Sequence, residues 1–201
     1  MSKRSVKQSH IRDLNIIDII LIDHQYIKEC IEILVNEKSS KSHKLEIANG
    51  FLTSLKKHSS VEEKVVYLPL ETEEEFHFNI LEAKIEHGIV EEKIKELKPK
   101  IAHSKVLKDE LEAELKVLAE LVKNHLKEEE SELLPKMNEL LEEETLKLMG
   151  SEFMKLRKMT SADIENYSEL QDQLVTWKDD VQKISSQFLS KMDRYVENLK
   201  H

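Results

Sequence analysis

Apolar residues recur every three or four positions through nearly the whole chain, and this spacing constrains the fold more than any other feature. The first such segment, about residues 13–36, carries a stripe that comprises Ile17, Ile20, His24, Ile27, Ile31 and Leu34. Similar stripes run through about residues 43–67, 76–97 and 111–133. The 201 residues include only 3 glycines and 3 prolines, too few for the tight turns of a sandwich, a barrel or a Rossmann-type fold. The pattern predicts an all-α protein.

The charge balance and the single cysteine narrow the class of protein further. Acidic residues outnumber basic ones by 40 to 31, which gives a formal net charge of −9 and argues against a nucleic-acid partner. No apolar run of about 18 residues is present, so we expect no membrane span, and the basic start lacks the apolar core of a signal peptide. Cys30 alone excludes an intrachain disulfide and a cysteine-based metal site. We therefore expect a cytoplasmic location.

The chain beyond Pro135 predicts additional helices. A segment over residues 139–149 is expected to end at Gly150, a residue that often follows the last turn of a helix. A last long helix, with apolar positions from Ile164 to Leu199, fits either packing on its own bundle or a coiled-coil seam in a homodimer. We therefore divide the chain into an N-terminal arm (1–12), a four-helix bundle (13–136) and a C-terminal helical extension (137–201).

Four of the nine histidines fall on the apolar stripes, one on each of the four predicted helices of the bundle. They are His24, His58, His87 and His125. His58 and His125 are each followed four residues later by a glutamate, Glu62 or Glu129, and this spacing places both side chains on one helix face. A single histidine of this kind is more simply a core residue. A glutamate on an apolar face, however, is costly unless it is paired or bound to a metal, so the set of six predicts a metal site.

An internal repeat arranges these residues in two halves. Residues 58–63 and 125–130 share the pattern HxxxEE, and a lone stripe histidine precedes each block by 34 or 38 residues. The chain therefore reads as two αα-hairpins that bring four histidines and two glutamates to one centre, as in four-helix di-metal proteins. If His87 and the His125/Glu129 pair lie at the same depth in the bundle, the rise per helical residue places the turn between the third and fourth helices near residues 104–107. Pro99 is then a kink or a helix end before this turn.

Imidazole and carboxylate ligands without sulfur suit iron, manganese or zinc, and the spacing does not choose among them. Six ligands exceed what one tetrahedral zinc accepts, and they fit two metals that each take two histidines and share both glutamates. With one oxo or hydroxo bridge, each metal would keep room for a small exogenous ligand. Glu91 makes a third HxxxE with His87 and is a candidate extra ligand. We expect Glu63 and Glu130 to lie outside the ligand set. Tyr67 could donate a hydrogen bond near the site, although packing at its rim is the simpler interpretation.

The series His24, His58-x-x-x-Glu62, His87, His125-x-x-x-Glu129 resembles the hemerythrin-like, or HHE cation-binding, family over roughly residues 13–136. The resemblance implies a non-haem di-iron centre in an antiparallel up-down-up-down bundle. It also implies that the histidines are terminal iron ligands and that both glutamates bridge the irons. The oxygen-carrying hemerythrins have a third-helix HxxxH pair, and this chain has Ala83 in place of its first histidine. The ligand pattern is closer to that of hemerythrin-like iron sensors and of di-iron proteins that repair iron–sulfur centres.

Three functions are compatible with this pattern. The first is a module that senses or binds oxygen, nitric oxide or iron, with a small diatomic molecule or a peroxide as its partner. The second is a di-iron redox enzyme that turns over peroxide or nitric oxide, or repairs an iron centre; no residue is assigned a catalytic role. The third is a structural bundle without metal. No phosphate-binding glycine loop, Ser-His-Asp triad or Cys-His pair supports another chemistry.

Overall fold

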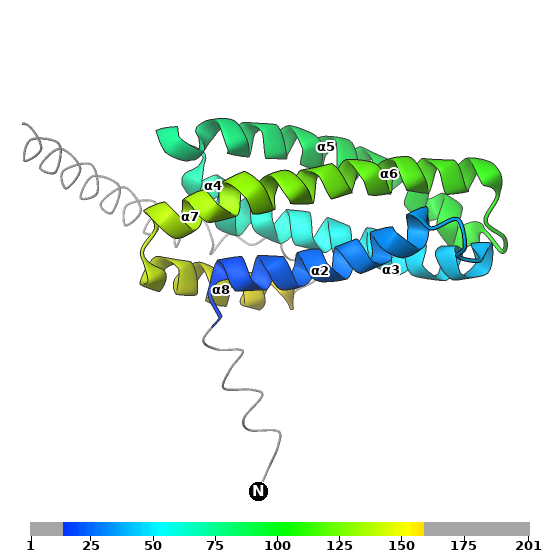
Figure 1. Cartoon of the computed structure of the whole chain (residues 1–201), viewed down its shortest axis with the longest axis horizontal. Coiled ribbons are helices and arrows are strands. Elements are labelled where there is room, and N and C mark those ends of the chain that lie inside the picture. Colours follow the sequence, from blue (N-terminus) through cyan, green and yellow to red (C-terminus); the bar gives the residue numbers. More distant parts are fainter. Residues whose placement is uncertain (1–13, 159–201) are drawn as a thin grey trace, which may run out of the picture.

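A computed structural model describes residues 14–158. Four long helices lie side by side and alternate in direction (Figure 1). They are α2 (Ile16–Val35), α3 (Lys41–Glu62), α5 (Glu74–His103) and α6 (Asp109–Glu128). Helix α2 packs against α3 and α6, and α5 packs against the same two helices, so the four enclose one interior. The all-α prediction is confirmed for the described residues.

The connections between the long helices follow from local sequence signals. Helix α2 begins at a capping box, in which the Asn15 side chain accepts from the Asp18 N–H and the Asp18 side chain accepts from the Asn15 N–H. Helix α5 continues through Pro99 to His103, and residues 104–108 form the turn to α6. The predicted position of this turn is confirmed, whereas a helix end at Pro99 is wrong. Pro99 lies on an exposed face, where water can satisfy the carbonyl that loses its helical donor.

Both HxxxEE blocks pass from α-helix into a π-helical turn. Turn η1 (Glu63–Tyr67) follows α3, and η2 (Glu129–Leu133) follows α6. Each leads into a short helix with a proline in its first turn, α4 (Leu68–Leu70) or α7 (Leu134–Leu140). A proline cannot donate to the carbonyl four residues earlier and its ring clashes with that carbonyl, and the wider π turn removes this conflict. Helix α7 therefore continues for five residues past Pro135, whereas α4 ends one residue after Pro69.

Helix α8 (Glu143–Arg157) packs on α2 and α3. Gly150 lies inside this helix, so the predicted helix end at Gly150 is wrong. A Cβ at Gly150 would lie 2.9 Å from the Leu14 carbonyl oxygen and 3.0 Å from the Ile16 nitrogen, so glycine allows α8 to approach the start of α2 closely. The predicted N-terminal arm, the last long helix and its dimer seam lie outside the described residues, and the division into three parts stays a prediction.

A polar layer separates two apolar clusters in the interior. Along α2, Ile20 belongs to the cluster near α7 and α8, Ile27 belongs to the cluster at the other end, and His24 lies between them. Along α5, Ala83 and Val90 flank His87 in the same way. The stripe histidines therefore meet at one level of the bundle. Within residues 14–158, no helix combines the length and the apolar content that a membrane crossing requires.

Candidate metal centre

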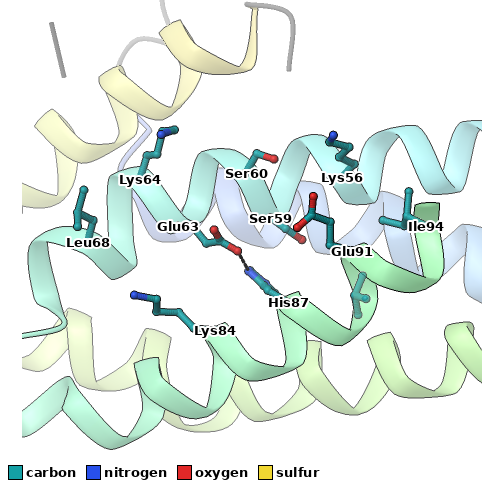
Figure 2. Close-up of a pocket in the computed structure, with 11 residues that line it drawn as sticks. Lys56, Ser59, Ser60, Glu63, Lys64, Leu68, Lys84, His87, Glu91 and Ile94 are labelled. Atoms are coloured by element: carbon teal, nitrogen blue, oxygen red, sulfur yellow. Dashed lines mark hydrogen bonds and ion pairs between the residues drawn. The ribbon is translucent and has the colours of Figure 1, made fainter. Parts of the chain in front are cut away.

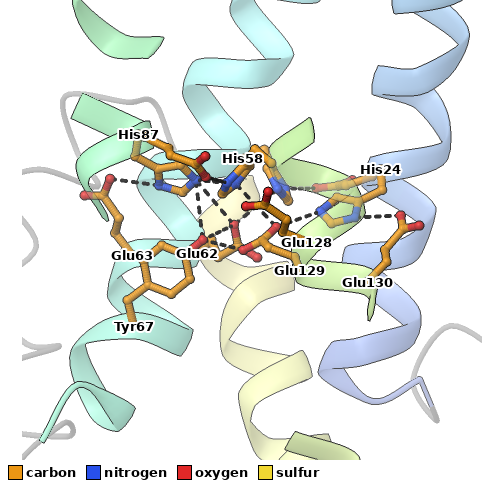
Figure 3. Close-up of polar contacts among 12 residues, drawn as sticks. His24, His58, Glu62, Glu63, Tyr67, His87, Glu128, Glu129 and Glu130 are labelled. Atoms are coloured by element: carbon orange, nitrogen blue, oxygen red, sulfur yellow. Dashed lines mark hydrogen bonds and ion pairs between the residues drawn. The ribbon is translucent and has the colours of Figure 1, made fainter. Parts of the chain in front are cut away.

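Six buried side chains from the four long helices and the start of η2 meet in this polar layer (Figure 3). They are His24, His58, Glu62, His87, His125 and Glu129, and none is more than 3% exposed. The structure thus brings together the six residues that helical spacing singles out. We call these six residues the His/Glu cluster.

The four histidines of the cluster form two pairs. The ring centroids of His24 and His58 lie 5.0 Å apart, and those of His87 and His125 lie 4.7 Å apart. The Nε2 atoms of His87 and His125 approach to 3.0 Å. Two imidazole lone pairs at this distance repel each other unless a proton or another cation lies between them.

Each glutamate of the cluster contacts one histidine from each pair. Glu62 Oε2 lies 3.3 Å from His58 Nε2 and 3.8 Å from His87 Nε2. Glu129 Oε2 lies 3.3 Å from His24 Nε2 and 3.4 Å from His125 Nε2. Both carboxylates therefore lie between the two histidine pairs, where a group shared by two cations would lie.

The Nδ1 atom of each histidine faces a carboxylate outside the cluster. The acceptors are Glu130 for His24 (2.9 Å), Asp23 for His58 (3.4 Å), Glu63 for His87 (3.0 Å) and Glu86 for His125 (2.7 Å). An ionised carboxylate only accepts hydrogen bonds, so it keeps the proton on Nδ1 and turns the Nε2 lone pair inward. All four imidazoles are thereby oriented as metal ligands are in proteins.

Sequence reasoning missed two of these acceptors, Asp23 and Glu86. Each directly precedes a lone stripe histidine, so the internal repeat is longer than HxxxEE and includes an acidic residue before His24 and His87. Asp23 on α2 bonds a histidine on α3, and Glu86 on α5 bonds a histidine on α6. The two acidic residues could therefore be recognised as part of the repeat in the sequence. The histidines on neighbouring helices that they bond could not be predicted from it.

Positively charged side chains contact the two carboxylates that accept from His24 and His58. Lys28 Nζ donates to Glu130 Oε1 at 2.6 Å, and Arg157 Nη1 lies 2.8 Å from Asp23 Oδ2. Arg157 belongs to α8, so the described part of the C-terminal extension reaches the environment of His58 through Asp23. This chain of contacts links the extension to one side of the His/Glu cluster.

Tyr67 is a buried polar neighbour of the cluster rather than a rim residue. It is 0% exposed, and its hydroxyl donates to Glu129 Oε1 and, at 3.3 Å, to Glu62 Oε2. Burial and these two carboxylates raise the pKa of the hydroxyl well above its usual value, so it remains a proton donor. In an α-helix, the residue five positions after Glu62 would point about 140° away from it. The π turn η1 brings Tyr67 back to the interior.

Glu91 is not brought to the cluster. Its carboxylate is exposed and pairs with Lys95 at 3.0 Å. It lines a pocket of about 420 Å³ between α3 and α5 that reaches His87, in which the Glu63–His87 contact is visible (Figure 2). We call this the lysine-lined pocket, because its lining includes Lys56, Lys64 and Lys84.

The inward-facing atoms of the cluster fit a metal better than a hydrogen-bond network. Within the described residues, four of them are buried without a hydrogen-bond partner: His24 Nε2, His58 Nε2, Glu62 Oε1 and Glu129 Oε2. Each such atom costs about 1–3 kcal/mol unless something else satisfies it. The potential ligand atoms form two groups, and within each group all of them lie within 4.8 Å of one another. The first group comprises His24, His58, Glu62 and Glu129, and the second comprises Glu62, His87 and His125. Glu62 belongs to both groups.

The electrostatics of the cluster also point to a bound cation. Burial alone would lower the pKa of His58, but the carboxylates of Glu62, Asp23 and Glu129 outweigh it and raise the pKa to about 10. Burial likewise opposes ionisation of Glu129, but His125 and His24 outweigh it and lower its pKa. The site therefore attracts positive charge, which protons supply here and a metal ion can supply in their place.

This fold and this cluster define a class of helical proteins that bind cations through histidine and carboxylate. Comparison with known families agrees, because residues 15–137 match the model of the hemerythrin HHE cation binding domain. The match covers more than half of the chain, and the protein belongs to this family. Neither the curated proteins nor the solved structures contain a significant match.

Proposed function

We propose that the protein holds a non-haem di-iron centre with an oxo or hydroxo bridge in an antiparallel up-down-up-down bundle. The four histidines of the cluster would be terminal ligands, and Glu62 and Glu129 would bridge the two irons. The observation that carries this proposal is that each glutamate contacts one histidine of each pair. Six nitrogen and oxygen ligands without sulfur suit iron.

The proposed role is to sense or bind oxygen, nitric oxide or iron in the cytoplasm. Iron, when bound, would supply open coordination positions for a small diatomic molecule or a peroxide. Two pockets support access to the site, since one reaches His87 and another reaches His125. The buried hydroxyl of Tyr67 adds a hydrogen-bond donor beside the carboxylates.

Metal analysis of the purified protein tests the centre directly. We expect about two irons per chain, as in di-iron proteins of this ligand type, together with the charge-transfer absorption of an oxo-bridged ferric pair. His58→Ala and Glu129→Ala should lower the iron content and the thermal stability together, because the metal offsets a buried polar layer. Glu91→Gln is the matched control and should keep both values. One zinc per chain, or no metal, would refute the proposal.

A di-iron redox enzyme is the second candidate, favoured by the same Tyr67 hydroxyl, which can hold a proton at the carboxylates. The two roles differ in turnover. Reversible spectral changes on exposure to oxygen or nitric oxide, without net consumption, fit binding or sensing. Sustained consumption of peroxide or nitric oxide at catalytic rates would instead assign the enzyme.

A further inference from the structure

A second pocket, of about 200 Å³, lies between α5 on one side and α6 with η2 on the other. Five of its nine lining residues are glutamates: Glu82, Glu86, Glu128, Glu129 and Glu132. The other lining residues are Asn79, Ala83, His125 and Leu133, so the described lining contains no lysine or arginine. We call this the acidic pocket.

The acidic pocket leads from the surface to the His/Glu cluster. Glu82, Glu128 and Glu132 are exposed at its mouth, and Glu86 is half-buried and bonds His125 Nδ1 at 2.7 Å. His125 and Glu129 line the pocket as well, and both are only 3% exposed. Glu129 Oε2 has no hydrogen-bond partner among the described residues. A series of carboxylates therefore extends from the solvent-exposed mouth of the pocket to Glu129 Oε2, an oxygen of the His/Glu cluster that has no hydrogen-bond partner among the described residues.

The lysine-lined pocket approaches the same histidine pair from the other side of α5 and has a different charge. Its lining contains three lysines and two glutamates, Glu63 and Glu91 (Figure 2). Of these two pockets, only the acidic pocket has glutamates and no lysine or arginine in its described lining. A concave surface lined by one sign of charge concentrates ions of the opposite sign and speeds their association, and the effect is stronger for a divalent ion.

We propose that the acidic pocket is the route by which a divalent metal cation enters the His/Glu cluster. The exposed glutamates at the mouth collect the cation, and Glu86 and Glu129 line the path to the histidines. This inference rests on the proposed metal centre, and it assigns a transport role to four glutamates that are not ligands in that proposal: Glu82, Glu86, Glu128 and Glu132.

The test compares rates of metal loading. Metal-free protein is mixed with ferrous iron under anaerobic conditions, and the iron that a ferrous chelator can still capture is measured over time. The variant Glu82→Gln/Glu132→Gln removes two charges at the mouth without touching a histidine. We expect loading to slow by about fivefold, with the final iron content unchanged. Added salt should slow the unaltered protein more steeply than the variant, because screening weakens the same attraction.

The matched control is Glu92→Gln/Glu110→Gln, which changes the net charge equally at exposed positions outside both pockets. This control should load at the rate of the unaltered protein. Equal loading rates for all three proteins would overturn the entry route and leave the metal centre intact. A lower final iron content in the mouth variant would also overturn it, because those glutamates would then hold the metal. Failure of the unaltered protein to take up iron would overturn the proposed function itself.

Discussion

Raising the pH is expected to destabilise the metal-free protein, because the pKa values of three buried histidines, His24, His58 and His125, are raised in the folded state. The clearest case is His58, whose pKa is raised to about 10 by Glu62, Asp23 and Glu129 despite the opposing effect of burial. In the unfolded chain the same imidazole titrates near 6.5. The stabilisation is therefore fully present below pH 6.5 and is lost as the pH rises toward 10.

The size of this effect follows from proton linkage. Between the two pKa values the folded chain binds one more proton than the unfolded chain, so the free energy of unfolding falls by about 1.4 kcal/mol per pH unit. His58 alone then costs about 3 kcal/mol between pH 7 and pH 9. The pKa values of His24 and His125 are also raised, since their carboxylate partners outweigh burial, and both act in the same direction.

Urea unfolding in the presence of EDTA, followed by circular dichroism at several pH values from 6 to 9, measures this slope. His58→Gln should give a shallower slope, whatever its absolute stability. Metal uptake should release protons, and metal affinity should rise with pH, because bound imidazoles are neutral. A free energy of unfolding that stays constant or rises between pH 7 and pH 9 without metal would refute this account of the cluster.

Further predictions concern single side chains. Gly150→Ala should destabilise the protein by about 1–3 kcal/mol, because the new methyl meets the backbone before α2. The same change at Gly88, where nothing lies within 4 Å, should stabilise it by about 0.5–1 kcal/mol, and urea titration compares the two. Tyr67→Phe should weaken iron retention about tenfold in chelator competition, because a carboxylate of the centre loses its donor; equal retention would contradict this role. Asp23→Asn should weaken retention similarly, because the His58 ring loses its ionised acceptor.

The residues that meet in the cluster could be predicted from the sequence because helical geometry is local. His24 and His87 lie at the same three- and four-residue spacing as the apolar residues of their helices. They therefore lie on the same helix face and are buried with those residues. The hydrogen bonds to their Nδ1 atoms depend on how neighbouring helices are rotated and shifted. No repeat within one helix contains that information.

The errors at Tyr67 and Gly150 have a common cause, since both concern the backbone rather than the side-chain pattern. Tyr67 reaches the interior because a π turn adds a residue to one helical turn, and an α-helical projection places it elsewhere. Gly150 resembles a helix end because glycine is common there, but its missing side chain serves a contact with a segment more than a hundred residues earlier.

The polar layer between the two apolar clusters also has a consequence for how the bundle opens. Each cluster has its own hydrophobic contacts, and without metal the level between them consists of side chains that water solvates well. The two ends can then exchange their amide hydrogens as separate cooperative units with different protection. Metal ions bound by ligands from all four helices at that level would tie the helices together, so that the bundle would open as a single unit. In this fold, bound metal would determine the cooperativity of unfolding as well as the free energy of unfolding.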